Sequence, residues 1–187
     1  MKNNPLSQNF LQDLAIVKKI IQSAQLQPDD VVLEVGPGKG ILTQELAKYA
    51  QKVIAIEIDR ELVTHLAEKF KNNSQVKIIL GDILKINISD LIERHSGYKV
   101  IANIPYYITS AIIRLFMESP APPAEMILMV QKEVAKRIVA PQGEMSLLSV
   151  SVQYYSTPEI LFIVDRTAFS PAPEVDSAII KISNIAL

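Results

Sequence analysis

Strand-like segments alternate with helix-like or polar segments along most of this sequence, and this alternation restricts the fold more than any other feature. The strand-like runs are VVLEVG (31–36), KVIAIEID (52–59), VKIILGD (76–82), KVIAN (99–103) and EMILMV (125–130). Such alternation is typical of βαβ units, in which helices connect the parallel strands of one sheet. The sequence therefore predicts an α/β fold with a mostly parallel sheet.

The two ends of the chain depart from this pattern. After residue 145, the runs SLLSVSVQYYS (146–156), EILFIVD (159–165) and DSAIIKISN (176–184) look like strands with no room for crossover helices. They predict an antiparallel hairpin at one edge of the sheet. Before the first strand, residues 13–24 have apolar residues at helical spacing, and Asp13 is a suitable N-cap.

Length and composition exclude several kinds of protein. The 187 residues, 49% of them hydrophobic, are enough for one domain with a buried core. The absence of cysteine excludes disulfides and thiolate zinc sites, and two histidines are too few for a histidine metal cluster, so we expect no metal site. Without an apolar signal core or a long apolar span, we expect a cytoplasmic protein with no membrane partner. No long apolar surface stripe is evident, so a monomer is expected.

The charge balance limits how the chain could bind nucleic acid. Nineteen basic residues face 20 acidic ones, so the net charge is −1 and any surface for a polyanion must be local. Lys132, Lys136 and Arg137 lie together on one predicted helix and are candidates for phosphate contact. A solvated helix face is the alternative interpretation.

A glycine-rich segment, EVGPGKG (34–40), connects the first strand to the next helix. Glycines at such a turn allow close approach of the backbone to a ligand. Ile41 stands where the dinucleotide motif G-x-G-x-x-G requires its last glycine, so the turn favours a ligand without phosphate, such as S-adenosylmethionine. We assign Glu34, Gly36 and Gly38 to this site, although the glycines alone also fit an ordinary tight turn.

Acidic residues end the next two strands. Glu57 follows the first glycine by about 20 residues, the offset at which a carboxylate can accept hydrogen bonds from ribose hydroxyls. Asp82 ends the third strand, where it could accept from an adenine amino group, with Ile83 against the ring and Ile58 beside Glu57. Each acid alone could be a solvated loop residue. Together with the glycines, they predict a cofactor site at the carboxyl ends of the strands.

The fourth strand ends in Asn103, followed by Ile104, Pro105 and Tyr106. The Asn103 side-chain oxygen and the Ile104 carbonyl could accept both hydrogens of a nucleobase amine, and Pro105 would fix the backbone between them. Tyr106 offers a flat face on which a flipped-out base could stack. A turn with aromatic packing is the alternative, and the adjacent cofactor features argue against it.

The chain resembles the ribosomal RNA adenine N6,N6-dimethyltransferases and the related large-subunit enzymes that confer macrolide resistance. The matching segments span nearly the whole chain: QNFLQD (8–13), EVGPGKGILT (34–43), IEIDREL (56–62), GDIL (81–84), NIPYYITS (103–110), MVQKEVAKRI (129–138) and FSPAPEVDSAI (169–179). The resemblance implies a Rossmann-like class I S-adenosylmethionine-dependent methyltransferase fold, a mostly parallel seven-stranded sheet with an antiparallel edge hairpin. It also implies that residues 1–187 are a single catalytic domain, without the helical domain that follows in small-subunit members.

The resemblance also implies roles for individual residues. Asn9 and Leu11 would close over the cofactor, and Gly36 would contact its methionine part. Glu57 would bind its ribose and Asp82 its adenine. Asn103 would stand at the point of methyl transfer, and the target base would lie between Tyr106 and Phe169.

The expected activity is transfer of methyl groups from S-adenosylmethionine to the N6 amine of adenosines in small-subunit rRNA, giving N6,N6-dimethyladenosine. The partner would be rRNA or the small ribosomal subunit, in ribosome biogenesis. Methylation of large-subunit rRNA and a non-catalytic nucleic-acid-binding or assembly role stay open as alternatives. Methylation of a small molecule is disfavoured, because the NIPY segment with its stacking tyrosine suits a planar amine.

Overall fold

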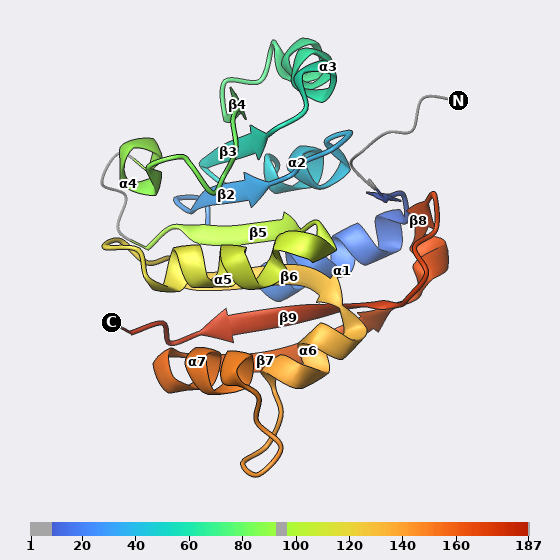
Figure 1. The fold of residues 1–187 in the computed structure, drawn as a ribbon. Coiled ribbons are helices and arrows are strands. Elements are labelled where there is room, and N and C mark those ends of the chain that lie inside the picture. The colour runs from blue at the N-terminus through green and yellow to red at the C-terminus, as the bar shows by residue number, and fades with distance from the viewer. Residues whose placement is uncertain (1–8, 93–96, 187) are drawn as a thin grey trace.

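The computed structural model describes residues 9–92 and 97–186. They form a seven-stranded sheet with the strand order β4-β3-β2-β5-β6-β9-β7 (Figure 1). The strands are β2 (Val31–Val35), β3 (Lys52–Glu57), β4 (Val76–Leu80), β5 (Lys99–Asn103), β6 (Glu125–Gln131), β7 (Thr157–Val164) and β9 (Ser177–Ser183). The first five are mutually parallel, whereas β9 runs antiparallel to both of its neighbours. The predicted fold class and the antiparallel edge hairpin are confirmed.

Helices cover both faces of the sheet. They are α1 (Leu14–Ala24), α2 (Ile41–Leu46), α3 (Arg60–Phe70), α4 (Ile88–Leu91), α5 (Thr109–Met117), α6 (Lys132–Ile138) and α7 (Leu147–Tyr155), with 3-10 turns η1 (Tyr106–Ile108) and η2 (Arg166–Ala168). Within the described residues, none of these helices is both long and apolar enough to cross a membrane. The predicted N-cap of α1 is confirmed, because the Asp13 side chain accepts from the N–H of Ala15 at 2.8 Å.

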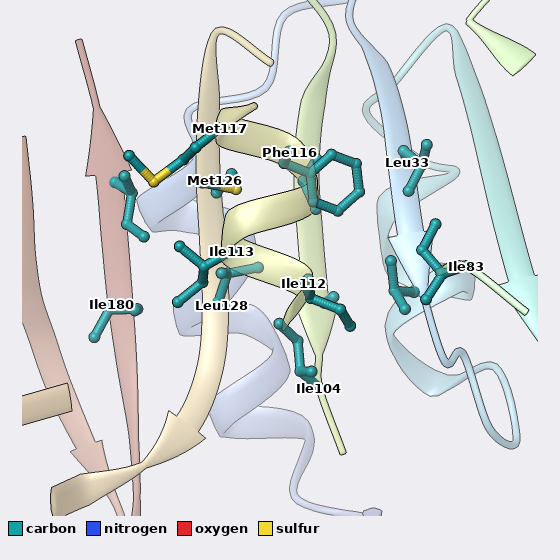
Figure 2. Close-up of a cluster of buried hydrophobic side chains, with 14 of the residues drawn as sticks. Leu33, Ile83, Ile104, Ile112, Ile113, Phe116, Met117, Met126, Leu128 and Ile180 are labelled. Carbon is teal, nitrogen blue, oxygen red and sulfur yellow. The ribbon is translucent and has the colours of Figure 1, made fainter. Parts of the chain in front are cut away.

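Two hydrophobic clusters make up the core, one on each face of the sheet. Along β2, Leu33 belongs to the cluster under α5, whereas Val32 belongs to the cluster with α1 and α2. Figure 2 shows the first cluster, in which Ile113 and Phe116 of α5 pack against the sheet. Because central strands are buried on both faces, their sequences are almost continuously apolar. This burial explains why these strands could be recognised from the sequence.

The interpretation of residues 146–156 as a strand was wrong, because Leu147–Tyr155 form helix α7. Ser146 and Ser149 form a capping box that begins this helix, although Ser-x-x-Ser lacks the Glu or Gln by which a capping box is recognised in a sequence. Only Ser149 and Val152 are fully buried, while Leu147 is 84% exposed. The helix thus carries apolar residues on its solvent side, and this hides the helical period in the sequence.

A second, two-stranded sheet joins a segment before α1 to the segment that precedes β9. Strands β1 (Phe10–Leu11) and β8 (Phe169–Ser170) pair antiparallel, with Leu11 opposite Phe169. The Gln12 N–H donates to the Ala168 carbonyl at 2.9 Å and extends the contact. The segment after residue 8 is therefore held beside the carboxyl ends of the parallel strands.

Candidate active site

A pocket of about 340 Å³ lies at the carboxyl ends of β2, β3 and β5. The short strands β1 and β8 also contribute to its wall. The structure brings every predicted site residue into the lining of this one pocket: Asn9, Leu11, Glu34, Gly36, Gly38, Glu57, Ile58, Asp82, Ile83, Asn103, Tyr106 and Phe169. The individual roles of these residues in binding the cofactor or the target base remain predictions.

The glycine turn after β2 is packed tightly on both sides. A Cβ on Gly38 would lie 3.0 Å from the Phe10 ring, and one on Gly40 would lie 2.7 Å from Leu66 of α3. Gly40 also has a φ of +75°, which side chains rarely adopt. The turn is therefore fixed between β1 and α3, and its shape depends on glycine at these two positions.

Glu57 connects this turn to the end of β3. Its Oε2 accepts from the Gly38 N–H at 3.1 Å, and its Oε1 accepts from the N–H groups of Ile58 at 2.9 Å and Asp59 at 3.1 Å. Burial raises the pKa of Glu57, and these three N–H groups oppose the rise. Since a carboxylate oxygen can accept two hydrogen bonds, Oε2 keeps capacity for a ligand hydroxyl.

Asp82 and Ile83 form the neighbouring part of the pocket. The Asp82 Oδ1 accepts from the Leu84 N–H at 3.1 Å, and its Oδ2 lies 3.4 Å from the Lys85 ammonium. Ile83 is buried, whereas Leu84 and Ile58 are exposed at the rim. A carboxylate beside apolar side chains can receive an amino group of a flat heterocycle.

The NIPY segment lies against the glycine turn. A Cβ on Gly36 would lie 3.8 Å from Pro105 and 3.9 Å from the Asn103 carbonyl oxygen. No hydrogen bond among the described residues uses the Asn103 side chain, so its amide is available to a ligand. The end of β5 therefore borders the space that the glycine turn defines.

Two aromatic residues, Tyr106 and Phe169, also line the pocket. The Tyr106 hydroxyl is 2.7 Å from the Ser177 hydroxyl, and burial raises the pKa of this tyrosine. Phe169 is buried on β8, opposite Leu11 of β1. The pairing of β1 with β8 thus places Phe169 in the pocket wall although it is far from Tyr106 in sequence.

Glu34 is the most unusual acid in the site. It is fully buried, and its Oε2 has no hydrogen-bond partner within the described part of the chain. Burial raises the pKa of Glu34 to about 8, and the negative Glu57 adds to the rise. Thr43 and the Lys69 ammonium oppose it. A buried, unsatisfied carboxyl in the pocket lining is suited to a positively charged ligand.

Several residues of the pocket were not found from the sequence. Phe10 lies over the glycine turn, and the Lys39 ammonium is 4.9 Å from the centre of its ring. Tyr107 lines the pocket and is 69% exposed, and Leu84 stands at the rim. Phe10, Leu84 and Tyr107 lie in segments that match the family, QNFLQD, GDIL and NIPYYITS, but the sequence assigned them no role.

The basic residues of α6 are largely engaged with acids. The Lys132 ammonium lies 3.3 Å from Asp176, and the Lys136 ammonium lies 2.9 Å from Glu133. Contact of this helix with phosphate stays a prediction, and these ion pairs weaken it.

Solved structures with the same arrangement identify the class of fold. A 23S rRNA methyltransferase, ErmE, has a TM-score of 0.84 and 35% identity, covering 94% of this chain and 69% of that chain. A dimethyladenosine transferase from Plasmodium falciparum has a TM-score of 0.82 and 31% identity, covering 93% of this chain and 62% of that chain. The sheet order and the position of the pocket define a class I S-adenosylmethionine-dependent methyltransferase fold.

The sequence model described as ribosomal RNA adenine dimethylase matches residues 1–186. The chain belongs to this family. A ribosomal RNA small subunit methyltransferase A from Dehalococcoides mccartyi is 50% identical over 178 residues, which are 95% of this chain and 61% of that protein. The corresponding protein of Moorella thermoacetica is 46% identical, over 94% of this chain and 65% of that protein. The chain thus spans less than two thirds of the length of these relatives.

The residues of the pocket fit S-adenosylmethionine, the cofactor of this fold class. Glu57 retains an acceptor position for a hydroxyl, and Asp82 stands beside the apolar Ile83. The unsatisfied carboxyl of Glu34 suits the positive charge of this cofactor. A ligand can approach the backbone at Gly36, because glycine has no side chain and a Cβ there would lie 3.8 Å from its nearest described neighbour.

Proposed function

We propose that this chain transfers methyl groups from S-adenosylmethionine to the N6 amine of adenosines in small-subunit rRNA, giving N6,N6-dimethyladenosine. The observation that carries the proposal is that the residues assigned to the cofactor and the residue assigned to the target amine line the same pocket. Glu57 ends β3, and Asp82 lies two residues after the end of β4. Asn103 ends β5 with its side-chain amide unengaged among the described residues. The names of the relatives favour the small subunit.

In this mechanism the chain binds and orients, and the cofactor supplies the reactive methyl group when bound. Glu57 and Asp82 would hold polar groups of the cofactor, and the glycine turn would contact its methionine part. The Asn103 side-chain oxygen and the Ile104 carbonyl accept the two hydrogens of the target amine. Holding these hydrogens favours the pyramidal nitrogen whose lone pair is free to react. Alignment of two bound reactants is enough to supply a large part of the rate enhancement.

Tyr106 and Phe169 position the target base in the proposal. Both line the pocket, and each carries an aromatic ring. Stacking of a base on an aromatic side chain contributes about 1–3 kcal/mol. This contribution would help to hold an adenine that has left the RNA stack.

Three further features complete the proposal. The partner is rRNA within the small ribosomal subunit, the protein acts as a monomer, and its compartment is the cytoplasm. Large-subunit rRNA is the second candidate substrate, because the 23S rRNA methyltransferase has the same fold at 35% identity.

Methylation of isolated subunits tests the proposal. The chain is incubated with labelled S-adenosylmethionine and unmethylated small or large subunits, and the labelled nucleosides are identified by mass spectrometry. We expect N6,N6-dimethyladenosine from the small subunit alone. Label in the large subunit would favour the second candidate, and label in neither, despite cofactor binding, would contradict activity of this chain on its own.

A further inference from the structure

Lys69 reaches from the last turn of α3 to the back of the glycine turn. Its ammonium donates to the carbonyl of Lys39 at 3.0 Å and to that of Gly40 at 3.2 Å. It also lies 5.3 Å from the centre of the Phe70 ring. A side chain on the outer helix thus holds two successive carbonyls of the segment that shapes the pocket.

The same helix packs against the turn at close range. Leu66 and Phe70 of α3 would stand 2.7 Å and 2.9 Å from a Cβ on Gly40. The apolar contacts fix the distance between helix and turn, and the Lys69 hydrogen bonds fix the direction of the carbonyls. Hydrogen bonds from a charged donor are about twice as strong as those between neutral groups.

Lys69 also acts on Glu34, the buried acid on β2. Among the described residues, two charged groups act on Glu34: Glu57 of β3, which disfavours its anion, and Lys69 of α3, which favours it. Glu34 in turn favours the charged form of Lys69, whereas burial disfavours it. Each group therefore favours the charged form of the other, and the buried Glu34 Oε2 has no hydrogen-bond partner among the described residues.

We propose that Lys69 is a positioning residue of the cofactor pocket: it fixes the glycine turn and supplies the positive charge that lets Glu34 become an anion when a cationic cofactor binds. The inference rests on the proposed function. S-adenosylmethionine carries a sulfonium and an ammonium group against one carboxylate, so its net charge is positive. Its binding then displaces the proton of Glu34 to solvent, and the buried carboxylate balances the charge that enters the pocket.

Calorimetry of S-adenosylmethionine binding to the full chain tests this inference. Titrations between about pH 6 and pH 9, in buffers with different ionisation enthalpies, report affinity and proton release together. We compare Lys69→Met, Lys69→Arg and the control Lys71→Met. Lys71 lies at the end of the same helix, where it pairs with exposed Glu68 and makes no described contact with the turn. The amino group of S-adenosylmethionine also titrates in this range, but its contribution to proton release is the same for every variant and cancels in the comparison.

Wild type is expected to release a proton on binding at neutral pH. Lys69→Met should weaken binding about tenfold, since hydrogen bonds to a charged group are lost. It should also move the pH midpoint of binding upward, because Glu34 loses the cation that favours its anion. Lys69→Arg should restore both properties, and Lys71→Met should match wild type. Wild-type affinity and an unchanged midpoint in Lys69→Met would overturn the inference.

A ligand-free measurement separates this inference from the proposed function. The Glu34 carboxyl is followed by NMR in wild type, Lys69→Met and Lys71→Met. The pH midpoint of the Glu34 titration should be higher in Lys69→Met than in wild type, and unchanged in Lys71→Met. If wild type fails to bind S-adenosylmethionine, the proposed function is contradicted, and an unchanged Glu34 midpoint in Lys69→Met would overturn the role of Lys69 separately.

Discussion

The backbone N–H of Gly38 donates to the Glu57 Oε2 across 3.1 Å, so the glycine turn after β2 and the carboxylate that ends β3 form one unit. Two further N–H groups, from Ile58 and Asp59, hold the other oxygen of the same carboxylate. Glu57 therefore has an orientation fixed by the chain before any ligand arrives. A preoriented acceptor loses less entropy on binding than a mobile one.

Replacing Glu57 with alanine should weaken S-adenosylmethionine binding, because a charged acceptor for the ribose is lost. The expected cost is about 1.5–3 kcal/mol, measured by calorimetry. Glu61→Ala, an exposed acid in the first turn of α3, is the matched control. Unchanged affinity in Glu57→Ala would remove this residue from the ribose site.

Glu34→Gln should change how stability depends on pH. The pKa of Glu34 is raised from 4.5 to about 8 in the folded chain. Between pH 4.5 and about 8, the folded state therefore keeps a proton on Glu34 that the unfolded state has lost. The free energy of unfolding from this group therefore falls as the pH rises from 4.5 to about 8, and levels off above it. Glutamine has no such proton, so the part of the slope that Glu34 contributes should be lost, whereas the part from Glu57, whose pKa burial also raises, should stay.

Urea unfolding at a series of pH values checks the Glu34 prediction. One unit of pKa corresponds to about 1.4 kcal/mol, so Glu34 should lower the free energy of unfolding of wild type by a few kcal/mol between pH 4.5 and about 8. Glu144→Gln, in an exposed loop, should keep the wild-type slope. The prediction fails if Glu34→Gln keeps the full wild-type dependence of unfolding free energy on pH.

Gly40→Ala should destabilise the chain more than Gly143→Ala. Both glycines have positive φ, +75° and +97°, so alanine is strained at each, by about 1–2 kcal/mol. A Cβ on Gly40 also meets Leu66 at 2.7 Å, whereas one on Gly143 has no described residue within 4 Å. Overpacking adds about 1–3 kcal/mol at Gly40. Equal losses in thermal or urea unfolding would show that α3 yields to the added methyl.

Tyr106→Ala should reduce methyl transfer to RNA without weakening cofactor binding, because the ring is assigned to the base. Tyr106→Phe keeps the stacking face and loses the hydrogen bond with Ser177, so it should retain most of the turnover. Turnover is measured with small subunits and cofactor affinity by calorimetry. Equal damage to both properties in Tyr106→Ala would assign the ring a structural role.

Much of the fold and the site could be predicted from the sequence because the signals are local. Strands buried on both faces read as continuous apolar runs, and in a parallel sheet the residues after each strand converge at one edge. The pairing of Phe10 with Ser170 had no local signal, since it joins distant parts of the chain. Helix α7 was hidden by alternating serine and valine. The contact of Lys69 with the glycine turn depends on how α3 packs, which no spacing in the sequence reveals.

The most direct test of the central claim is single-turnover methyl transfer by Asn103→Ala, with cofactor affinity measured on the same preparation. Asn103 borders the glycine turn, and its side chain is unengaged within the described residues. We predict that the variant binds S-adenosylmethionine nearly as wild type does and forms no methylated adenosine on small subunits that wild type modifies. Transfer at the wild-type rate would contradict the claim that this pocket joins cofactor and adenine at Asn103.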